Sequence, residues 1–349
     1  MGKLVKRLSM VVLGALIVAG LIFSAGMNIA QAAEFNLTYG GNWPPTHPMS
    51  VATQEWINKI EKETDGRVKI KAFWASALYK PRESAMELGK GVADIGDLSG
   101  AYAPVGYDFE KSMRMAFWGL DDRFLGRKVY YAARAKYPQL DKEFADGNVK
   151  VMAYASIPPY QMLLAKKKIT STADFKGLTI KATGDLAKLV NELGGSGINM
   201  PMGETYTALQ KTTVDGAMAP YETLKSFRFA EVVDYGLKLD IGAAPAGHWG
   251  FNLDSWNKLP KDIQKVFVDN MEWFGNRIEE LVYAGEELGI NLAKENNVQF
   301  ITLPDSEIAK VYAIVDKTIL DQMKAVDAKG LPGTEVYKYM RGLIKQYSK

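Results

Sequence analysis

Five aromatic side chains stand where a small molecule could be recognised. They lie in or beside segments that end a predicted strand or form a loop, and they are Trp43, Tyr102, Trp118, Tyr221 and Trp249. Trp and Tyr combine a flat apolar face with a polar N–H or O–H tip, which suits a pocket for a small organic molecule. Each ring taken singly could equally belong to an ordinary core. Together they favour a ligand-binding cleft.

Residue types that carry out catalysis are scarce in this chain. It has no cysteine, which excludes thiolate metal sites, CxxC redox pairs and cysteine nucleophiles. Its two histidines, His47 and His248, form no HExxH pattern, and no GxSxG, SxxK or Walker A pattern occurs. We expect His47, in a proline-rich run, to bond to backbone and His248 to be a strand-end residue. A Ser-His-Asp triad stays open, because its members are distant in a sequence.

The charge of the chain disfavours nucleic-acid binding. The 349 residues contain 43 Lys and Arg against 40 Asp and Glu, and the excess is accounted for by Lys3, Lys6 and Arg7 in a segment without acids, residues 1–33. The rest of the chain is formally neutral. Proteins that bind nucleic acid need a basic face to release counterions from phosphates, so we expect no nucleic-acid partner.

Residues 1–33 have the pattern of a secretory signal peptide. The three basic residues precede an uncharged apolar run over residues 10–23, and the segment ends in the A-x-A sequence Ala30-Gln31-Ala32. This run is shorter than the ~20 residues that a membrane-spanning helix needs, and no later segment is long and apolar enough. We therefore expect a cleaved signal and a soluble protein in the periplasm. An uncleaved anchor is the alternative.

The elements that must position the aromatic residues alternate between strands and helices. The first strands are predicted over 35–40, 68–74 and 92–98, with helices over 50–64 and 81–89 between them. This order implies a mainly parallel sheet with helices on both faces, and such sheets bind ligands at the carboxyl ends of their strands. We therefore expect the site in the segments that follow these strands: 41–46, 76–80 and 99–102.

A second α/β unit follows the first. Further strands are predicted over 148–156, 161–165, 216–219 and 298–303, and residues 174–182 are predicted to end a connection in another short strand. The predicted helices cover 121–146, 185–193, 204–210, 260–284 or beyond, and 305–328. The pattern predicts an α/β fold of two lobes, each a mainly parallel sheet flanked by helices. The predicted parts are a first lobe over 34–155 with crossover segments from 240–290, a second lobe over 156–240, and C-terminal helical segments over 290–349 that pack on both lobes.

Two segments in the second half of the chain carry a family signature. Residues 174–181 read DFKGLTIK, and residues 194–216 read GGSGINMPMGETYTALQKTTVDG. They resemble a signature of the substrate-binding receptors of tripartite ATP-independent periplasmic (TRAP) transporters, D-x-K-G-x-x-x-R followed by G-x-x-P-x-x-M-x-x-x-E-x-Y-x-A-L-Q-x-G-x-V-D-G. Twelve positions match in order: Asp174, Lys176, Gly177, Leu178, Glu204, Tyr206, Ala208, Leu209, Gln210, Val214, Asp215 and Gly216. Weaker similarity extends over the rest of the chain that follows the signal.

The resemblance implies a fold like that of periplasmic binding proteins, with a ligand cleft between the lobes and a long helix near the C-terminal part. A receptor of this family closes on a small organic solute and delivers it to ion-coupled membrane permease subunits. It has no catalytic residue, no metal and no cofactor, and we expect a monomer.

The positions that hold the ligand in many family members are changed in this chain. The resemblance implies that Lys181 stands in place of an arginine that pairs with the ligand carboxylate, and Gln161 in place of a second arginine. Ala219 stands where others carry asparagine, and Met202 where an aromatic ring is common. Lysine keeps the positive charge but loses the planar, two-pronged recognition of a carboxylate.

We therefore expect Lys181 to face the cleft as the charge partner of a carboxylate or sulfonate. The other expected site residues are the hydrogen-bonding candidates Gln161, Asn42, Ser99 and Tyr102, the aromatic walls Trp43, Trp118, Tyr221 and Trp249, and Met202. Three alternatives stay open: a receptor for a neutral or zwitterionic solute, a periplasmic enzyme on the same scaffold, and a partner-binding protein without a cleft.

Overall fold

The computed structural model describes residues 33–118, 120, 123–242 and 245–347. Residues 1–32, on which the expected signal peptide rests, lie outside the described residues, as do 119, 121–122, 243–244 and 348–349. Among the helices of the described ranges, none is long and apolar enough to cross a membrane.

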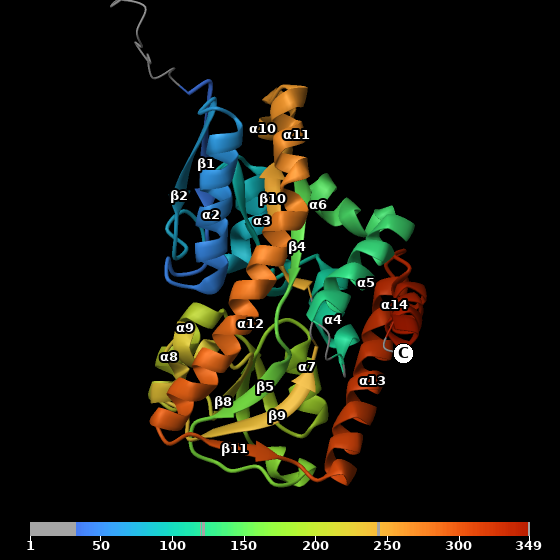
Figure 1. The fold of residues 1–349 in the computed structure, drawn as a ribbon. Helices are drawn as coiled ribbons and strands as arrows, with labels where there is room; N and C mark the ends of the chain where they lie inside the picture. Colours follow the sequence, from blue (N-terminus) through green and yellow to red (C-terminus); the bar gives the residue numbers. More distant parts are fainter. Residues whose placement is uncertain (1–32, 119, 121–122, 243–244, 348–349) are drawn as a thin grey trace, which may run out of the picture.

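Two β-sheets form the centres of two lobes (Figure 1). The first sheet has the order β2-β1-β3-β10-β4, with β1 at Phe35–Gly40, β2 at Val68–Phe73, β3 at Ile95–Leu98, β4 at Val149–Ser156 and β10 at Pro245–Asn252. The second has the order β11-β9-β5-β8-β6-β7, with β5 at Tyr160–Leu164, β6 at Thr179–Ala182, β7 at Ser196–Asn199, β8 at Gly216–Ala219, β9 at Tyr235–Ile241 and β11 at Gln299–Thr302. The predicted two-lobed α/β fold is confirmed.

Among the described strands, each sheet has one that runs against the others. It is the strand that arrives from the other lobe: β10 is antiparallel to β3 and β4, and β5 is antiparallel to β8 and β9. The remaining pairs are parallel. Each sheet is therefore mainly parallel, as expected, and its parallel strands present their carboxyl ends at one edge.

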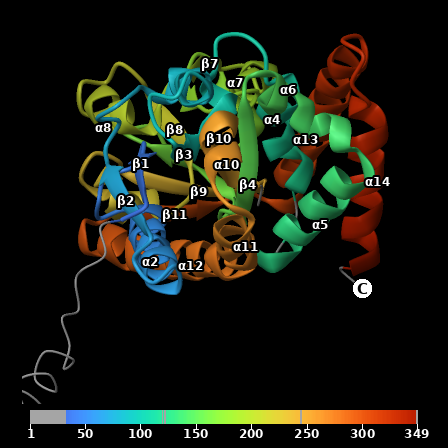
Figure 2. The same ribbon diagram turned by 90° about the horizontal axis from the view of Figure 1, so that it is seen from above.

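Helices cover both sheets. Those beside the first sheet are α2 (Pro48–Glu63), α3 (Ser84–Gly89), α4 (Asp108–Met113), α5 (Arg123–Lys136), α6 (Lys142–Asp146), α10 (Leu253–Lys258) and α11 (Lys261–Asp269). Those beside the second are α7 (Leu186–Glu192), α8 (Met202–Gln210) and α9 (Thr223–Ser226). The long helices are α12 (Met271–Glu295), α13 (Asp305–Asp327) and α14 (Gly333–Tyr347). Figure 2 shows α5, α13 and α14 gathered on one side of the molecule.

Two long helices connect the lobes. Helix α12 contacts α2 and β4 of the first lobe and α9 of the second, and α13 contacts α4 and α7. Trp56 of α2 stacks on Phe274 of α12 with ring centroids 4.9 Å apart, so the amino-terminal half of α12 is fixed to the first lobe. At the other half, a Cβ on Gly289 would collide with the carbonyl of Tyr221, so glycine lets α12 lie directly against the second lobe.

Two predicted helices are divided in the structure. The helix over 121–146 is divided, because α5 ends at Lys136 shortly before Pro138. A proline disfavours helical backbone at the residue that precedes it. The helix after Pro260 is divided at Asn270, whose side chain donates to the Val266 carbonyl in place of the regular helix bonding. The helix predicted over 305–328 corresponds to α13, and α14 follows it within the predicted C-terminal helical segments.

The sequence boundaries of the lobes stay a prediction. The chain passes from the first sheet to the second between β4 and β5, and it returns between β9 and β10. It passes to the second sheet again along α12, which leads into β11. Strands β7, β9 and β10 were absent from the predicted elements.

Candidate ligand-binding site

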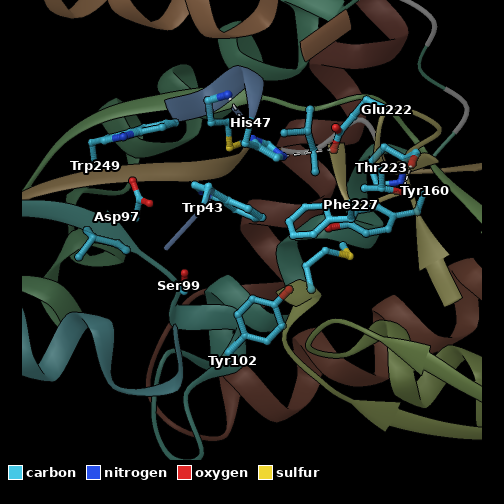
Figure 3. Close-up of a pocket in the computed structure, with 15 residues that line it drawn as sticks. Trp43, His47, Asp97, Ser99, Tyr102, Tyr160, Glu222, Thr223, Phe227 and Trp249 are labelled. Atoms are coloured by element: carbon cyan, nitrogen blue, oxygen red, sulfur yellow. Dashed lines mark hydrogen bonds and ion pairs between the residues drawn. The ribbon is translucent and has the colours of Figure 1, made fainter. Parts of the chain in front are cut away.

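A cavity lies between the two lobes, and its empty space, open solvent included, is about 570 Å³. Most of its lining follows the carboxyl ends of parallel strands of both sheets, where ligand binding was expected. The lining residues are Trp43, His47, Met49, Asp97, Leu98, Ser99, Tyr102, Ile157, Tyr160, Met202, Pro220, Glu222, Thr223, Phe227 and Trp249. Figure 3 shows Trp43, Phe227 and Tyr102 converging on the cavity from three different elements.

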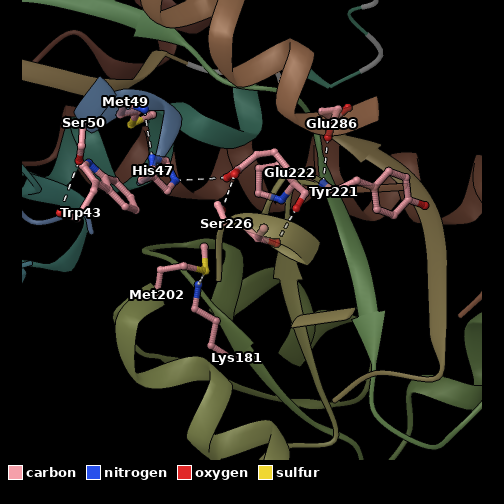
Figure 4. A network of polar contacts seen from close by, with 12 residues as sticks. Trp43, His47, Met49, Ser50, Lys181, Met202, Tyr221, Glu222, Ser226 and Glu286 are labelled. Atoms are coloured by element: carbon pink, nitrogen blue, oxygen red, sulfur yellow. Dashed lines mark hydrogen bonds and ion pairs between the residues drawn. The ribbon is translucent and has the colours of Figure 1, made fainter. Parts of the chain in front are cut away.

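His47 and Trp43 form one wall of the cavity. Their rings stack with centroids 4.7 Å apart. His47 caps α2, since its Nδ1 accepts a hydrogen bond from the Met49 N–H at 3.2 Å, which confirms the expected bond to backbone. This bond occupies Nδ1 and leaves Nε2 as the ring nitrogen that faces the second lobe. This Nε2 is buried, lies 3.6 Å from Glu222 Oε1 and makes no hydrogen bond within the described part of the chain (Figure 4).

Asp97 lies at the end of β3 in the same wall. Its carboxylate accepts hydrogen bonds from the Tyr39 hydroxyl and from the Asn42 backbone N–H, the latter at 2.7 Å. The Trp249 indole donates to the Tyr39 hydroxyl at 3.1 Å, which holds Trp249 in the wall. Burial raises the pKa of Asp97 to about 6, although the hydrogen bond from Tyr39 opposes this shift. Asp97 is thus an anchored acid that is mostly ionised at neutral pH.

Asn42 and Ser99 form a polar pair beside this acid. Asn42 Nδ2 donates to Ser99 Oγ at 3.1 Å, and Ser99 lines the cavity directly. The Oδ1 atom of Asn42 is buried and has no hydrogen-bond partner among the described residues. The Asn42 Oδ1 atom is therefore an acceptor next to the cavity that is available to a ligand.

Lys181 is fully buried on β6 in the second lobe. Its ammonium donates to Thr183 Oγ1 at 3.0 Å and lies 3.5 Å from Met202 Sδ, and Met202 lines the cavity. Thr183 Oγ1 is in turn 3.2 Å from the Tyr102 hydroxyl of the first lobe. The ammonium therefore lies at the seam between the lobes, directly behind a cavity-lining side chain.

Two further acids lie on the second-lobe side. Glu222, between β8 and α9, is 5% exposed and accepts a hydrogen bond from Ser226 Oγ at 2.6 Å. Behind it, Glu286 of α12 accepts the Tyr221 backbone N–H at 2.9 Å. Burial raises the pKa of Glu286 to about 7, and the nearby charges of Glu222 and Asp240 add to this shift. The interior next to this wall thus holds two acidic side chains that oppose each other's ionisation.

Three of the expected site residues lie away from the cavity. The Gln161 amide is engaged within the second sheet, donating to Asp240 at 2.8 Å and accepting from the Leu239 N–H at 2.7 Å. The Tyr221 ring points away from the Glu222 side chain (Figure 4), and its hydroxyl donates to Gly236 O at 3.4 Å. The Trp118 indole bonds to Asp316 of α13 at 3.1 Å and lies under the Arg341 guanidinium of α14.

Sequence reasoning missed several lining residues, and their signals differ. Glu222, Thr223 and Phe227 follow β8 closely, so the rule about strand carboxyl ends could have identified them. Asp97 also had a signal, since an acid within a short apolar strand is unusual for a core position. Residues 76–80, also expected near the site, are absent from the described lining.

Comparison with known proteins places the chain in a family. Residues 39–325 match the bacterial extracellular solute-binding protein family 7, and the chain belongs to this family. It is similar to the 2,3-diketo-L-gulonate-binding periplasmic protein YiaO of Escherichia coli K12, with 25% identity over 298 residues, which are 82% of this chain and 86% of the relative. The monocarboxylate 2-oxoacid-binding periplasmic protein of a Nostoc species is 27% identical over 239 residues, 65% of this chain and 62% of that protein.

Solved structures agree with the family. A TRAP periplasmic solute-binding protein from Desulfovibrio salexigens has a TM-score of 0.73 and 26% identity, covering 90% of this chain and 97% of that one. A TRAP solute-binding protein from Rhodoferax ferrireducens, in complex with copurified benzoate, has a TM-score of 0.81 and 22% identity over 90% and 98% of the two chains, and shows the shared fold. The chain is therefore a TRAP solute-binding protein, as its signature indicates, and members of this family are receptors.

Proposed function

We propose that this protein is the periplasmic receptor of a TRAP transporter and that it closes its two lobes on a small organic acid. One observation carries the proposal: a fully buried ammonium, that of Lys181, lies at the seam of the lobes behind a cavity built from both of them. A buried cation is costly unless an anion or hydrogen bonds compensate it. The positive charge of Lys181 would attract a carboxylate or sulfonate to this side of the cavity in the closed state.

The names of the relatives support the same solute class. Diketogulonate, 2-oxoacids and benzoate are the ligands named for similar proteins, and all are organic acids. We extend the class, and no particular member of it, to this chain.

The proposal assigns roles to the expected site residues. Lys181 holds the acid group, and Trp43, Tyr102, Ser99, Met202 and Trp249 contact the solute from the cavity wall. Four expected residues stabilise the cavity wall and the helices next to it: Asn42, Gln161, Trp118 and Tyr221. We also propose that residues 1–33 are removed on export, and that the mature monomer hands its solute to membrane permease subunits.

Thermal unfolding with a panel of small carboxylates and sulfonates tests the proposal. A receptor is stabilised by the solute that it binds, since binding to the folded state alone raises the unfolding temperature. The solute recovered after the measurement should be chemically unchanged, whereas an enzyme would consume it. No stabilisation by any acid of the panel would contradict the proposal.

A further inference from the structure

The charged groups that line the cavity directly are acids. Asp97 faces it from the first lobe and Glu222 from the second. Of the described residues in the lining, none is Lys or Arg, and Lys181 reaches the cavity only behind Met202. A solute with negative charge alone would meet two carboxylates at close range, in an interior where water screens them poorly.

Within the described residues, Glu222 pairs with His47 at 3.6 Å, and none of the Lys and Arg ion pairs found there includes Glu222. The His47 Nε2 to Glu222 Oε1 distance of 3.6 Å exceeds that of a hydrogen bond. Burial and the nearby charge of Glu222 raise the pKa of Glu286, so these two acids disfavour each other's ionised forms. The wall therefore has an acceptor, Glu222 Oε1, that is suited to a cationic donor.

His47 Nε2 is buried, makes no hydrogen bond among the described residues and lies 3.6 Å from Glu222 Oε1. This contact is longer than a hydrogen bond, so a cationic nitrogen of a solute can make a shorter and stronger contact with Glu222 Oε1.

The aromatic lining suits a cationic nitrogen as well. Trp43 and Phe227 meet edge to face with centroids 6.0 Å apart, and both line the cavity with Tyr102 and Tyr160. The faces of aromatic rings attract ammonium groups, and cages of several rings bind quaternary ammonium ligands.

We propose that the solute is a zwitterion, with a cationic nitrogen facing Glu222 and the aromatic rings and an acid group facing Lys181. This assignment rests on the proposed function, because it takes Lys181 as the partner of the acid group. It adds a second charged point of recognition, which a simple carboxylate lacks.

Pairs of probes that differ only at the nitrogen test the assignment. Glycine betaine is matched with 3,3-dimethylbutanoate, proline with cyclopentanecarboxylate, and 4-(aminomethyl)benzoate with 4-ethylbenzoate. In each pair a carbon replaces the cationic nitrogen while shape and acid group stay the same. Calorimetric titration of the protein, freed of bound solute, should show binding at least tenfold tighter for the nitrogen member of the pairs that bind.

Two variants test whether Glu222 causes the preference for the nitrogen member of a pair. Glu222→Gln keeps the size of the side chain and removes its charge, so the preference for the nitrogen member should fall at least tenfold. Glu295→Gln, at an exposed position of α12, makes the same change in net charge and should leave the preference unaltered. Circular dichroism of both variants verifies that they are folded.

The outcomes separate the two proposals. Equal or tighter binding of the carbon members would overturn the zwitterion assignment and leave an organic-acid receptor. A preference that persists in Glu222→Gln would overturn the role of Glu222. Failure of every probe and of the organic-acid panel to bind would overturn both the assignment and the proposed function.

Discussion

Replacing Lys181 by methionine removes the ammonium and nearly preserves the length of the side chain. Lys181 Nζ is held by Thr183 at 3.0 Å, so it is fixed in place before a solute arrives. A hydrogen bond to a charged group contributes about 1.5–3 kcal/mol. Because Lys181 is fully buried, salt and water screen it little, and we expect about 2–3 kcal/mol for this site.

This free energy corresponds to binding weakened by about 30-fold to 150-fold, since each 1.4 kcal/mol changes a dissociation constant tenfold. Calorimetric titration with the tightest acid of the panel measures it. Lys166→Met is the matched control, because Lys166 is on the same lobe and its side chain is 75% exposed. Thermal unfolding of the solute-free variants verifies folding. A Lys181→Met variant that is folded and binds within twofold of the parent would refute the reasoning.

Three further results are expected. Trp43→Ala should weaken the binding of an organic solute more than the binding of sulfate, by about 1–3 kcal/mol if the ring is covered on binding. Trp118→Ala should instead lower the melting temperature and change the binding of both ligands alike. Equal losses of affinity for both ligands in Trp43→Ala would count against a role of Trp43 in the cavity wall. Small-angle scattering should give a smaller radius of gyration with solute, as hinge closure requires, and an unchanged radius at saturation would argue for a rigid cleft. Glu286, with a pKa raised from 4.5 to about 7, binds more protons in the folded than in the unfolded state between these values, so its contribution to the free energy of unfolding falls as pH rises through this window. Glu286→Gln should therefore reduce the loss of stability between pH 4.5 and 8 by up to about 3 kcal/mol in urea unfolding, and a loss equal to that of the parent would contradict the pKa shift.

Much of the fold could be predicted because local patterns carry it. The parallel start of the first lobe follows from strand and helix periodicities, and the structure has β1, α2 and β2 close to the expected ranges. Strand β9 also had a local signal, since its residues Leu237, Leu239 and Ile241 are buried in alternation.

Strand β10 had no such signal. It contains Pro245, Gly247 and Gly250, which disfavour strands when they are judged locally. It forms because the chain returns between β3 and β4, and this pairing is a property of the whole fold.

The site could be predicted only in part for a related reason. Trp43 and Trp118 were both expected in the cleft, yet one lines the cavity and the other packs on Asp316 and Arg341, about two hundred residues away in the chain. Gln161 likewise finds its partners in β9. Sequence patterns identify residues that suit a cleft, while the distant partners that hold them elsewhere appear only in three dimensions.

The central claim is that the protein captures a small organic acid and releases it unchanged. Mass spectrometry of the solute released on denaturing the protein, after purification from the periplasm, tests it most directly. The account predicts one intact small molecule with a carboxylate or sulfonate group, which rebinds to the refolded protein and stabilises it. A solute without an acid group, or one that the refolded protein converts to another compound, would contradict the claim.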